Sequence, residues 1–420
     1  MRRLPFQFWL RRRRLFLLAV SILCICILYT LGTILWKTDE TTLEAFKDEN
    51  DSCGRFESIS SYRQHPDYDL ERRIDSELLA IQHREESKPP PNLPVRKIWQ
   101  TWRERVVPEK FDQPEVWRKL HPSWEHNVVS DRDAPALVSY ELGTVPYFKH
   151  LFYSSSRPII RADLLRYTLL WHYGGLYADI DVHPVRSVEA CGPMSPLFAK
   201  DENMDISLVI GIEVDEPYAS ARRRKFWGWD GTHGFIQYAM YAPRPFSPIL
   251  RRAIVRSIAH SVKHETENIP WYRPADKFDN TAVLETTGPG MFTEAVLDVL
   301  SESLPSNHSL KLSQRQKDAC PGDGSARSNG ERGRVTWAPF YRLTEPCWIF
   351  DEDLMNGNVT QSSGGLGVMP INVWGNGQRH SGSENFRSHQ ACLNHHFSGT
   401  WKQSWLHRTL LKWFHGYSRR

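Results

Sequence analysis

The sequence is poor in cysteine and has no C-x-x-C pair. Seven cysteines occur among 420 residues, and none has the spacing of a zinc site. Two of them, Cys24 and Cys26, lie within an apolar run near the N-terminus, and five follow it: Cys53, Cys191, Cys320, Cys347 and Cys392. Disulfides form in an oxidising compartment, but five is an odd number and spacing identifies no partners, so the sequence predicts no particular pairing.

The chain also lacks the excess of positive charge that is typical of nucleic-acid-binding proteins. Its formal charge of +4 comes from seven basic residues that flank the apolar run: Arg2, Arg3, Arg11, Arg12, Arg13, Arg14 and Lys37. Without them, 46 basic and 49 acidic side chains remain. No basic-aromatic pattern of the kind that binds nucleic acid appears either, so we expect no nucleic-acid partner.

One long apolar run, residues 15–36, has 22 residues and no charge. As a helix it would be roughly 33 Å long, enough to cross a bilayer. Six arginines precede it, so the positive-inside rule predicts a cytosolic tail over 1–14 and a lumenal remainder. A cleaved signal peptide is the alternative, disfavoured because the run ends in Leu-Trp-Lys. The basic tail 404–420 is too short and too charged to span a membrane.

Residues 37–94 are predicted to form a stem. The segment is charged, contains a single expected helix over 70–84, and ends in the stiff proline-rich run 89–94. A folded domain is predicted over 95–403. Two triplets in it, starting at Asn307 and Asn358, are glycosylation acceptors, which is consistent with a secretory route.

Strand and helix patterns alternate along the domain. Strands are expected over 96–102, 124–130, 207–212 and 234–240, and helices over 114–120, 134–153, 248–264 and 291–300. Residues 314–334 and 361–389 are expected to be long loops. This alternation predicts an α/β domain with a mainly parallel sheet, in which ligands bind at the carboxyl ends of the strands.

The segment 161–184 contains the most informative pattern. Asp163 and Arg166 are three residues apart, which places them on one face of a helix. Two glycines, Gly174 and Gly175, then end the helix before a short strand. Asp179 and Asp181 follow, and side chains two apart in an extended segment point the same way. Paired carboxylates at a strand end are typical of divalent cation sites.

This string, D-x-x-R followed by H-Y-G-G-L-Y-A-D-I-D, resembles the glycosyltransferases with sugar-binding DxD regions. In particular it resembles family 32, which contains the initiation-specific α-1,6-mannosyltransferase of the fungal Golgi. Later strings resemble the same family: I-W-Q-T-W at 98–102, G-I-E-V-D at 211–215, T-G-P at 287–289 and H-H-F-S-G-T-W-K at 395–402. The resemblance implies a single GT-A-like domain that binds a nucleotide sugar.

The resemblance also implies roles for individual residues. The metal ligands would be Asp179, Asp181 and His396, with His395 as the fallback for the imidazole. The donor would be bound by Trp102, Asp163, Arg166, Asp179, Gly288 and Lys402. The catalytic or acceptor-facing residues would be Glu213, Asp215 and Gln237. For the two acidic residues, pairing with the nearby run Arg222–Arg224 is an equal alternative.

The implied function is metal-dependent transfer of mannose from GDP-mannose to glycoprotein glycans, with Mn²⁺ or Mg²⁺ and with the α configuration retained. The implied place is the Golgi membrane, held by one N-terminal helix, with other mannosyltransferases as candidate partners in a complex. Three alternatives stay open: a different donor hexose, a glycosphingolipid acceptor, and an inactive sugar-binding subunit of a glycosylation complex.

Overall fold

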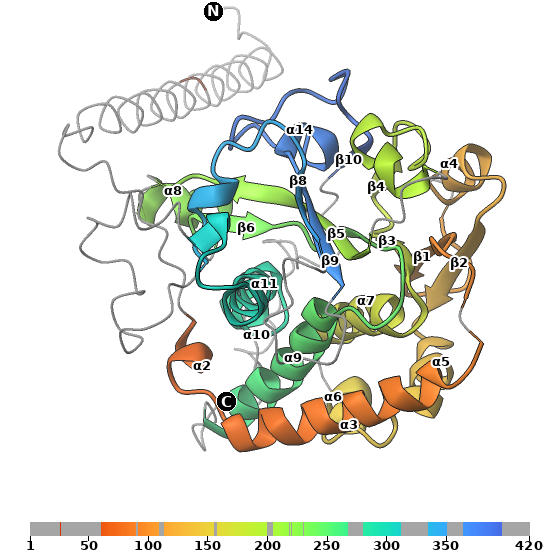
Figure 1. The fold of residues 1–420 in the computed structure, drawn as a ribbon, viewed down its shortest axis with the longest axis vertical. Coiled ribbons are helices and arrows are strands. Elements are labelled where there is room, and N and C mark those ends of the chain that lie inside the picture. Colours follow the sequence, from red (N-terminus) through yellow and green to blue (C-terminus); the bar gives the residue numbers. More distant parts are fainter. Residues whose placement is uncertain are drawn as a thin grey trace, which may run out of the picture. The chain divides into compact units, whose positions relative to one another are not determined.

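The computed structural model describes residues 26, 60–89, 91–108, 113–154, 158–199, 205–217, 219, 221–229, 231–267, 280–311, 335–350 and 364–396 (Figure 1). The chain divides into two compact units, Met1–Gly54 and Arg55–Arg420, and the fold below is that of the second unit. Among the described residues, no helix has both the length and the apolar character needed to cross a membrane. The predicted segment 15–36, apart from Cys26, lies outside them, as do Lys402 and the tail 404–420.

An eight-stranded sheet lies at the centre of the described fold, in the order β2-β1-β3-β7-β5-β9-β8, with β6 paired to β5. Its strands are β1 (Lys97–Trp102), β2 (Glu125–Ser130), β3 (Gly175–Ala178), β5 (Ile206–Asp215), β6 (His233–Phe235), β7 (Ala239–Ala242), β8 (Cys347–Ile349) and β9 (Gly365–Met369). A separate two-stranded sheet pairs β4 (Val182–Pro184) with β10 (Leu393–His395).

The large sheet is mixed. β1 is parallel to β2 and β3, and β5 is parallel to β9, whereas β7 runs antiparallel to both β3 and β5. β6 and β8 are antiparallel to their neighbours β5 and β9. Five strands therefore share one direction, β1, β2, β3, β5 and β9, and their carboxyl ends lie at one edge. The expected α/β architecture is present, with a mixed sheet in which most strands point the same way.

Helices cover both faces of the sheet. The helical elements are α2 (Ser61–Gln64), α3 (Tyr68–Glu86), α4 (Gln113–Leu120), α5 (Ala134–Leu142), α6 (Phe148–Ser154), α7 (Pro158–Tyr173), α8 (Ala221–Trp227), α9 (Pro248–Glu267), α10 (Asn280–Thr286), α11 (Pro289–Ser303) and α14 (Ile371–Trp374), with 3₁₀ turns η1 (Gly192–Phe198) and η3 (Ala338–Phe340). In Figure 1, α3, α6, α7, α9 and α11 lie below the sheet, and α4, α14, β4 and β10 lie above it.

Alternation along the strands separates two hydrophobic cores. In β1, Trp99 packs into the core shared with α7 and α9, whereas Ile98 packs into the core shared with α4 and α14. In β3, Tyr177 packs into the same core as Trp99, and Leu176 packs into the same core as Ile98. Burial on both faces of the sheet explains why the central strands β3 and β7 are fully buried and contain no charged residue.

Two glycines form the turn from α7 into β3. Gly174 and Gly175 have φ of 66° and 98°, a left-handed conformation that favours glycine. A Cβ atom on Gly175 would also lie 2.6 Å from the carbonyl oxygen of Lys97. Glycine is therefore needed here for the chain to reverse and for β3 to approach β1, and this turn delivers Asp179 to the edge of the sheet.

Helix α3 is part of the folded unit, although we expected residues 70–84 within a stem. One stripe of the helix, Leu70, Ile74, Leu78 and Ile81, is buried in the core on the α9 side. On its flank, the Arg251 guanidinium donates to Asp75 Oδ1 at 2.9 Å and to Gln82 Oε1 at 3.2 Å. The charged composition of the segment reflects the exposed face of an amphipathic helix.

Two other segments differ from the expectation. The helix expected over 134–153 is two helices, α5 and α6, because Gly143 and Pro146 lie between them and proline disfavours a continuous helix. The loop expected over 361–389 contains β9, a fully buried strand beside β5. Its Gly367 leaves space for an indole, since a Cβ there would lie 2.4 Å from the Trp348 ring.

The packing of α3 predicts a stability effect. Leu78→Ala removes a fully buried side chain and should lower the free energy of unfolding by about 2–5 kcal/mol, through lost burial and the cavity left behind. Arg73→Ala, on the exposed face of the same helix, should change it by less than about 0.5 kcal/mol. Denaturant titrations of both variants measure this. Equal effects would contradict the position of α3 in the core.

Candidate functional site

Polar side chains collect where β1, β3 and β5 end. Trp102 ends β1, Asp179 follows β3, and Asp215 ends β5. Gln237 lies just before β7, and because β7 runs antiparallel to β3, the start of β7 lies at the same edge. The Asp179 N–H donates to the Tyr238 carbonyl at 2.8 Å, which joins the two segments directly. The sequence prediction of a site at the carboxyl ends of the strands is consistent with this arrangement.

Three potential metal ligands meet at this edge. Ligand atoms of Asp179, Asp181 and His395 all lie within 4.8 Å of one another, and His395 Nε2 is 3.2 Å from Asp181 Oδ1. The side chains of Asp181 and His395 are 10% and 12% exposed and that of Asp179 is 27% exposed, so the cluster is sheltered but open to solvent on the Asp179 side. Two carboxylates and an imidazole suit Mn²⁺, and oxygen ligands also suit Mg²⁺.

The imidazole in the cluster belongs to His395, the fallback residue, and not to His396. β10 pairs with β4 so that His395 lies opposite Val182, the residue after Asp181. The next side chain points away, and the His396 ring stacks on Phe386 with centroids 5.1 Å apart. The His396 ring also lies 5.7 Å from the His183 ring, and its backbone N–H donates to the Asp181 carbonyl at 3.1 Å.

Arg166 connects helix α7 to the acidic segment. One guanidinium nitrogen is 3.2 Å from Asp163 Oδ1 and the other is 3.2 Å from Asp179 Oδ1. The Tyr177 hydroxyl donates to the same Asp179 oxygen at 2.7 Å, and the Arg166 guanidinium lies 5.1 Å from the centre of the Tyr177 ring. Asp179 therefore receives a positive charge and a hydroxyl on one oxygen, which fixes its orientation.

Asp163 is an interior residue. Its side chain has no exposed surface, and in addition to Arg166 it accepts from the Thr287 hydroxyl at 2.7 Å and from Gln237 Nε2 at 3.5 Å. Burial raises the pKa of Asp163 to about 6, against the opposing charge of Arg166 and the Thr287 hydrogen bond. In this conformation Asp163 cannot touch a donor sugar, and its contacts orient Arg166 instead.

Gln237 and Tyr238 lie on either side of the same site. The Tyr167 hydroxyl is 2.6 Å from Gln237 Oε1, so the Gln237 amide is held by two residues of α7, Tyr167 and Asp163. The Tyr238 ring packs against His395 with centroids 4.1 Å apart, and Gln378 Nε2 donates to its hydroxyl at 3.1 Å. Sequence reasoning did not assign Tyr177, Tyr238, Thr287 or Gln378. The first lies within the quoted motif and Thr287 opens the T-G-P string, but nothing in the sequence marks the other two.

The two acidic residues at the end of β5 have different surroundings. Asp215 accepts from the Trp337 indole at 2.8 Å and from the Arg342 N–H at 2.7 Å, and burial raises its pKa against these two bonds. Both of its oxygens are thus used within the fold. The ladder between β5 and β6 has a register shift between Ile212 and Val214, at Glu213. Glu213 is close enough to Tyr238 for its charge to help raise the tyrosine's pKa, after the larger effect of burial.

The remaining predicted donor contacts are Trp102, Gly288 and Lys402. Trp102 is half-buried at the end of β1 and has Arg103 beside its ring, 5.9 Å from the centroid. Gly288 is buried and precedes α11, where a Cβ would lie 2.6 Å from the Leu284 Cα, so this position requires glycine for packing. Lys402 lies outside the described residues.

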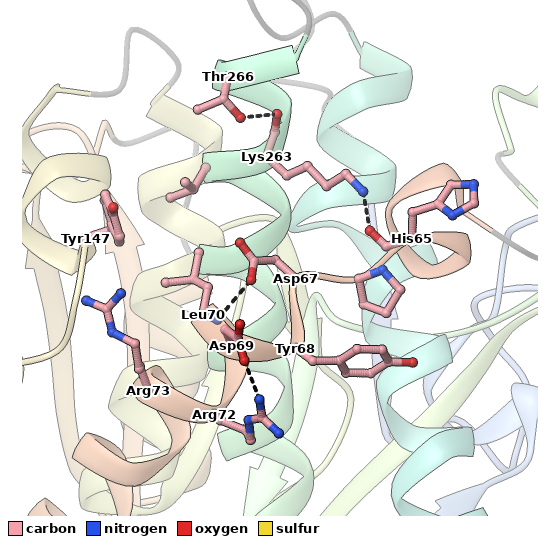
Figure 2. A pocket seen from close by; sticks show the side chains of 12 residues that line it. His65, Asp67, Tyr68, Asp69, Leu70, Arg72, Arg73, Tyr147, Lys263 and Thr266 are labelled. Carbon is pink, nitrogen blue, oxygen red and sulfur yellow. Dashed lines mark hydrogen bonds and ion pairs between the residues drawn. The ribbon is translucent and has the colours of Figure 1, made fainter.

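A groove elsewhere on the domain contains none of these residues. Figure 2 shows it at the start of α3, lined by side chains that include Tyr68, Arg73, Tyr147 and Lys263, with a volume of about 1070 Å³. It is open and charged, and the Lys263 ammonium donates to the His65 carbonyl across it. The chemistry at the carboxyl ends of the strands, rather than the size of this groove, identifies the candidate site.

Comparison with known proteins shows what the chain is similar to. Residues 109–198 match the family described as "Glycosyltransferase sugar-binding region containing DXD motif", and this span includes α7, Asp179 and Asp181. Among solved structures, the PaToxG glycosyltransferase is 15% identical, covers 60% of this chain and 86% of that chain, and has a TM-score of 0.30, too low a similarity to assign a fold.

Several individual relatives are named as mannosyltransferases. The initiation-specific alpha-1,6-mannosyltransferase of Schizosaccharomyces pombe is 26% identical over 73% of this chain and 63% of that protein, so the match spans less than two thirds of its length. The Candida albicans protein of that name is 24% identical over 76% and 74%. Mannosyl phosphorylinositol ceramide synthase CSH1 of Saccharomyces cerevisiae is 34% identical over 22% and 24%. The predicted resemblance is confirmed: the chain is similar to glycosyltransferases, several of which are named as mannosyltransferases.

The raised pKa of Asp163 predicts a pH-dependent difference in stability. Between its ordinary value of 3.8 and about 6, the unfolded carboxyl releases a proton that the native one retains. As the pH rises through this window, the free energy of unfolding of the wild-type protein should therefore fall relative to that of Asp163→Asn, whose side chain cannot ionise. Unfolding of both proteins from pH 3.5 to 7 measures the difference, with Asp69→Asn on the surface as the reference substitution. A difference that does not change with pH would refute the raised pKa.

Proposed function

We propose that this chain is a metal-dependent hexosyltransferase that transfers mannose from GDP-mannose to a glycan of glycoproteins, with retention of the α configuration. The observation that carries this proposal is the cluster of Asp179, Asp181 and His395 at the carboxyl edge of the sheet. The similarity to alpha-1,6-mannosyltransferases over most of the chain supports the choice of mannose.

We place the enzyme in the Golgi membrane with its catalytic domain in the lumen. The apolar run 15–36 and the arginines before it support this topology. The Cys191–Cys392 disulfide supports an oxidising compartment, because cytosolic thiols are kept reduced.

The reaction requires negative charge to be stabilised as the diphosphate leaves the sugar. The oxygen and imidazole ligands of the cluster fit a divalent cation such as Mn²⁺, which when bound supplies Lewis-acid stabilisation of that charge. Asp179, Asp181 and His395 would hold it. Arg166 and Tyr177 keep one oxygen of Asp179 engaged, which leaves the other to face the cluster. Asp163 contributes indirectly: from the interior of the fold, its carboxylate holds the Arg166 guanidinium in place.

The remaining groups position the two substrates. Trp102 presents an accessible indole at the end of β1, on which the donor base can stack. Two carboxylates were expected to face the acceptor. Both oxygens of Asp215 accept hydrogen bonds within the fold, from the Trp337 indole and the Arg342 N–H. Glu213, near Tyr238 and the cluster, is therefore the carboxylate we assign to the acceptor hydroxyl.

Metal-dependent hydrolysis of the donor tests the assignment. With Mn²⁺ and GDP-mannose, Asp181→Ala and His395→Ala should each lower the rate by about 10²–10³-fold, because one group that supports stabilisation of the leaving charge is lost. The matched control is His396→Ala, which removes the neighbouring imidazole outside the cluster and should retain activity close to wild type. Released GDP gives the rate.

The same assay separates the alternatives. Turnover with a UDP-sugar but not with GDP-mannose would overturn the assignment of GDP-mannose as the donor. Transfer to a ceramide glycolipid but not to a mannose oligosaccharide would overturn the assignment of a glycoprotein glycan as the acceptor. No turnover with any nucleotide sugar would favour an inactive sugar-binding subunit. Loss of activity in His396→Ala with retention in His395→Ala would exclude the ligand set proposed here.

Stacking of the base on Trp102 predicts a separate effect on donor affinity. Trp102→Ala should raise the KM for the donor by about 5- to 150-fold, since base–aromatic stacking contributes about 1–3 kcal/mol. Trp102→Phe, which keeps an aromatic face, should recover most of the affinity. Initial rates at varied donor concentration measure this, and an unchanged KM in Trp102→Ala would rule out the stacking role.

A further inference from the structure

The candidate cation site is assembled from two segments that are far apart in the chain. Asp181 and His395 are separated by 214 positions, and most of the described fold lies between them in sequence. Asp179 and Asp181 are fixed by the turn from α7 and by Arg166. His395 arrives on β10, a strand of only three residues. The position of the imidazole therefore depends on what holds β10.

The two-stranded sheet holds β10 directly against the segment that follows Asp181. Leu393 lies opposite Pro184, Asn394 opposite His183, and His395 opposite Val182. Backbone hydrogen bonds continue beyond both ends of this pairing. The Val185 N–H donates to the Cys392 carbonyl at 2.8 Å, and the His396 N–H donates to the Asp181 carbonyl at 3.1 Å.

A covalent bond closes one end of this sheet. Cys392 immediately precedes β10 and forms a disulfide with Cys191, which follows β4 by a short loop. Both cysteines are buried, at 2% and 0% exposure, in the core above the sheet. Isolated pairs of short strands are marginally stable in water. The disulfide thus fixes β10 to the β4 side three residues before His395.

We propose that the Cys191–Cys392 disulfide is a positioning device for His395, and that the cation affinity of the site depends on it. This inference rests on the metal site of the proposed function. With the disulfide formed, β10 stays in register and the imidazole stays beside Asp181. Without it, β10 keeps its three-residue ladder to β4, a single bridge from Asn394 to Asn376 and the Cys392 N–H bond to the Val373 carbonyl. These few contacts let His395 leave the cluster for much of the time. The large sheet keeps its own strand pairing, because neither cysteine lies in it.

The packing around His395 agrees with this role. The Tyr238 ring limits the imidazole on one side, at a centroid distance of 4.1 Å. Asn394, the preceding residue, donates to the Phe386 carbonyl at 2.9 Å. These contacts select the orientation of the side chain, whereas the register of the strand is set by the sheet and by the disulfide.

The test measures Mn²⁺ affinity of the full-length protein purified without reductant. Cys191→Ala/Cys392→Ala should bind Mn²⁺ about 10- to 100-fold more weakly than wild type, the usual cost of losing a group that orients a metal ligand. Cys347→Ala, which removes a half-buried cysteine of β8 outside the disulfide, should bind like wild type. Electron paramagnetic resonance of free Mn²⁺ gives the dissociation constants, at a temperature where every variant is folded.

A double-mutant cycle separates positioning from general destabilisation. His395→Ala should lose much less affinity in the disulfide-free background than in wild type, because the imidazole is already out of the cluster for much of the time there. Asp179→Ala, on the α7–β3 side, should lose the same factor in both backgrounds. If the double cysteine variant does not fold, Cys191→Ala/Cys392→Val, which refills the apolar core, takes its place.

The outcomes are distinguishable. A lower melting temperature with unchanged Mn²⁺ affinity would show that the disulfide only stabilises the fold, and would overturn the inference while leaving the metal site intact. Equal penalties for His395→Ala in both backgrounds would also overturn it. Failure of wild type to bind Mn²⁺ would overturn the proposed metal site, and the inference with it.

Discussion

The site depends on a buried guanidinium. Arg166 is 4% exposed, between Asp163 on its own helix and Asp179 at the end of β3. A buried ion is tolerated only when it is paired, and breaking such a pair by removing one partner costs about 3–5 kcal/mol. Helix α7 and the acidic segment therefore cannot move apart without leaving a charge unpaired. This constraint holds the Asp179 carboxylate at a fixed place on the sheet edge, where the rest of the site is assembled.

Much of this arrangement could be predicted from the sequence because it follows from local periodicity. Asp163 and Arg166 are one helical turn apart, and Gly174 and Gly175 end the helix. The placement of the site at the carboxyl ends of the strands follows from the alternation of helices and strands, a general property of α/β folds. Each of these features is set by neighbours within a few residues along the chain.

The features that were missed depend on long-range contacts. The choice between His395 and His396 is decided by the register of β10 against β4, and a strand of three residues has too little pattern to show it. The Cys191–Cys392 pair spans 201 positions, and spacing carries no information about such a pairing. β9 was expected to be a loop because of its glycines, yet Gly367 is small to make room for Trp348. Asp215 was expected to face the acceptor, but its partner Trp337 comes from a distant segment.

The order of the parts along the chain has a consequence for biosynthesis. β9 ends at Met369, so every strand of the large sheet has been translated before His395 emerges from the ribosome. All eight strands of the large sheet can therefore pair while the candidate cation site still lacks one ligand. The third candidate ligand is thus added in the last steps of synthesis, and a chain that ends before β10 would lack it.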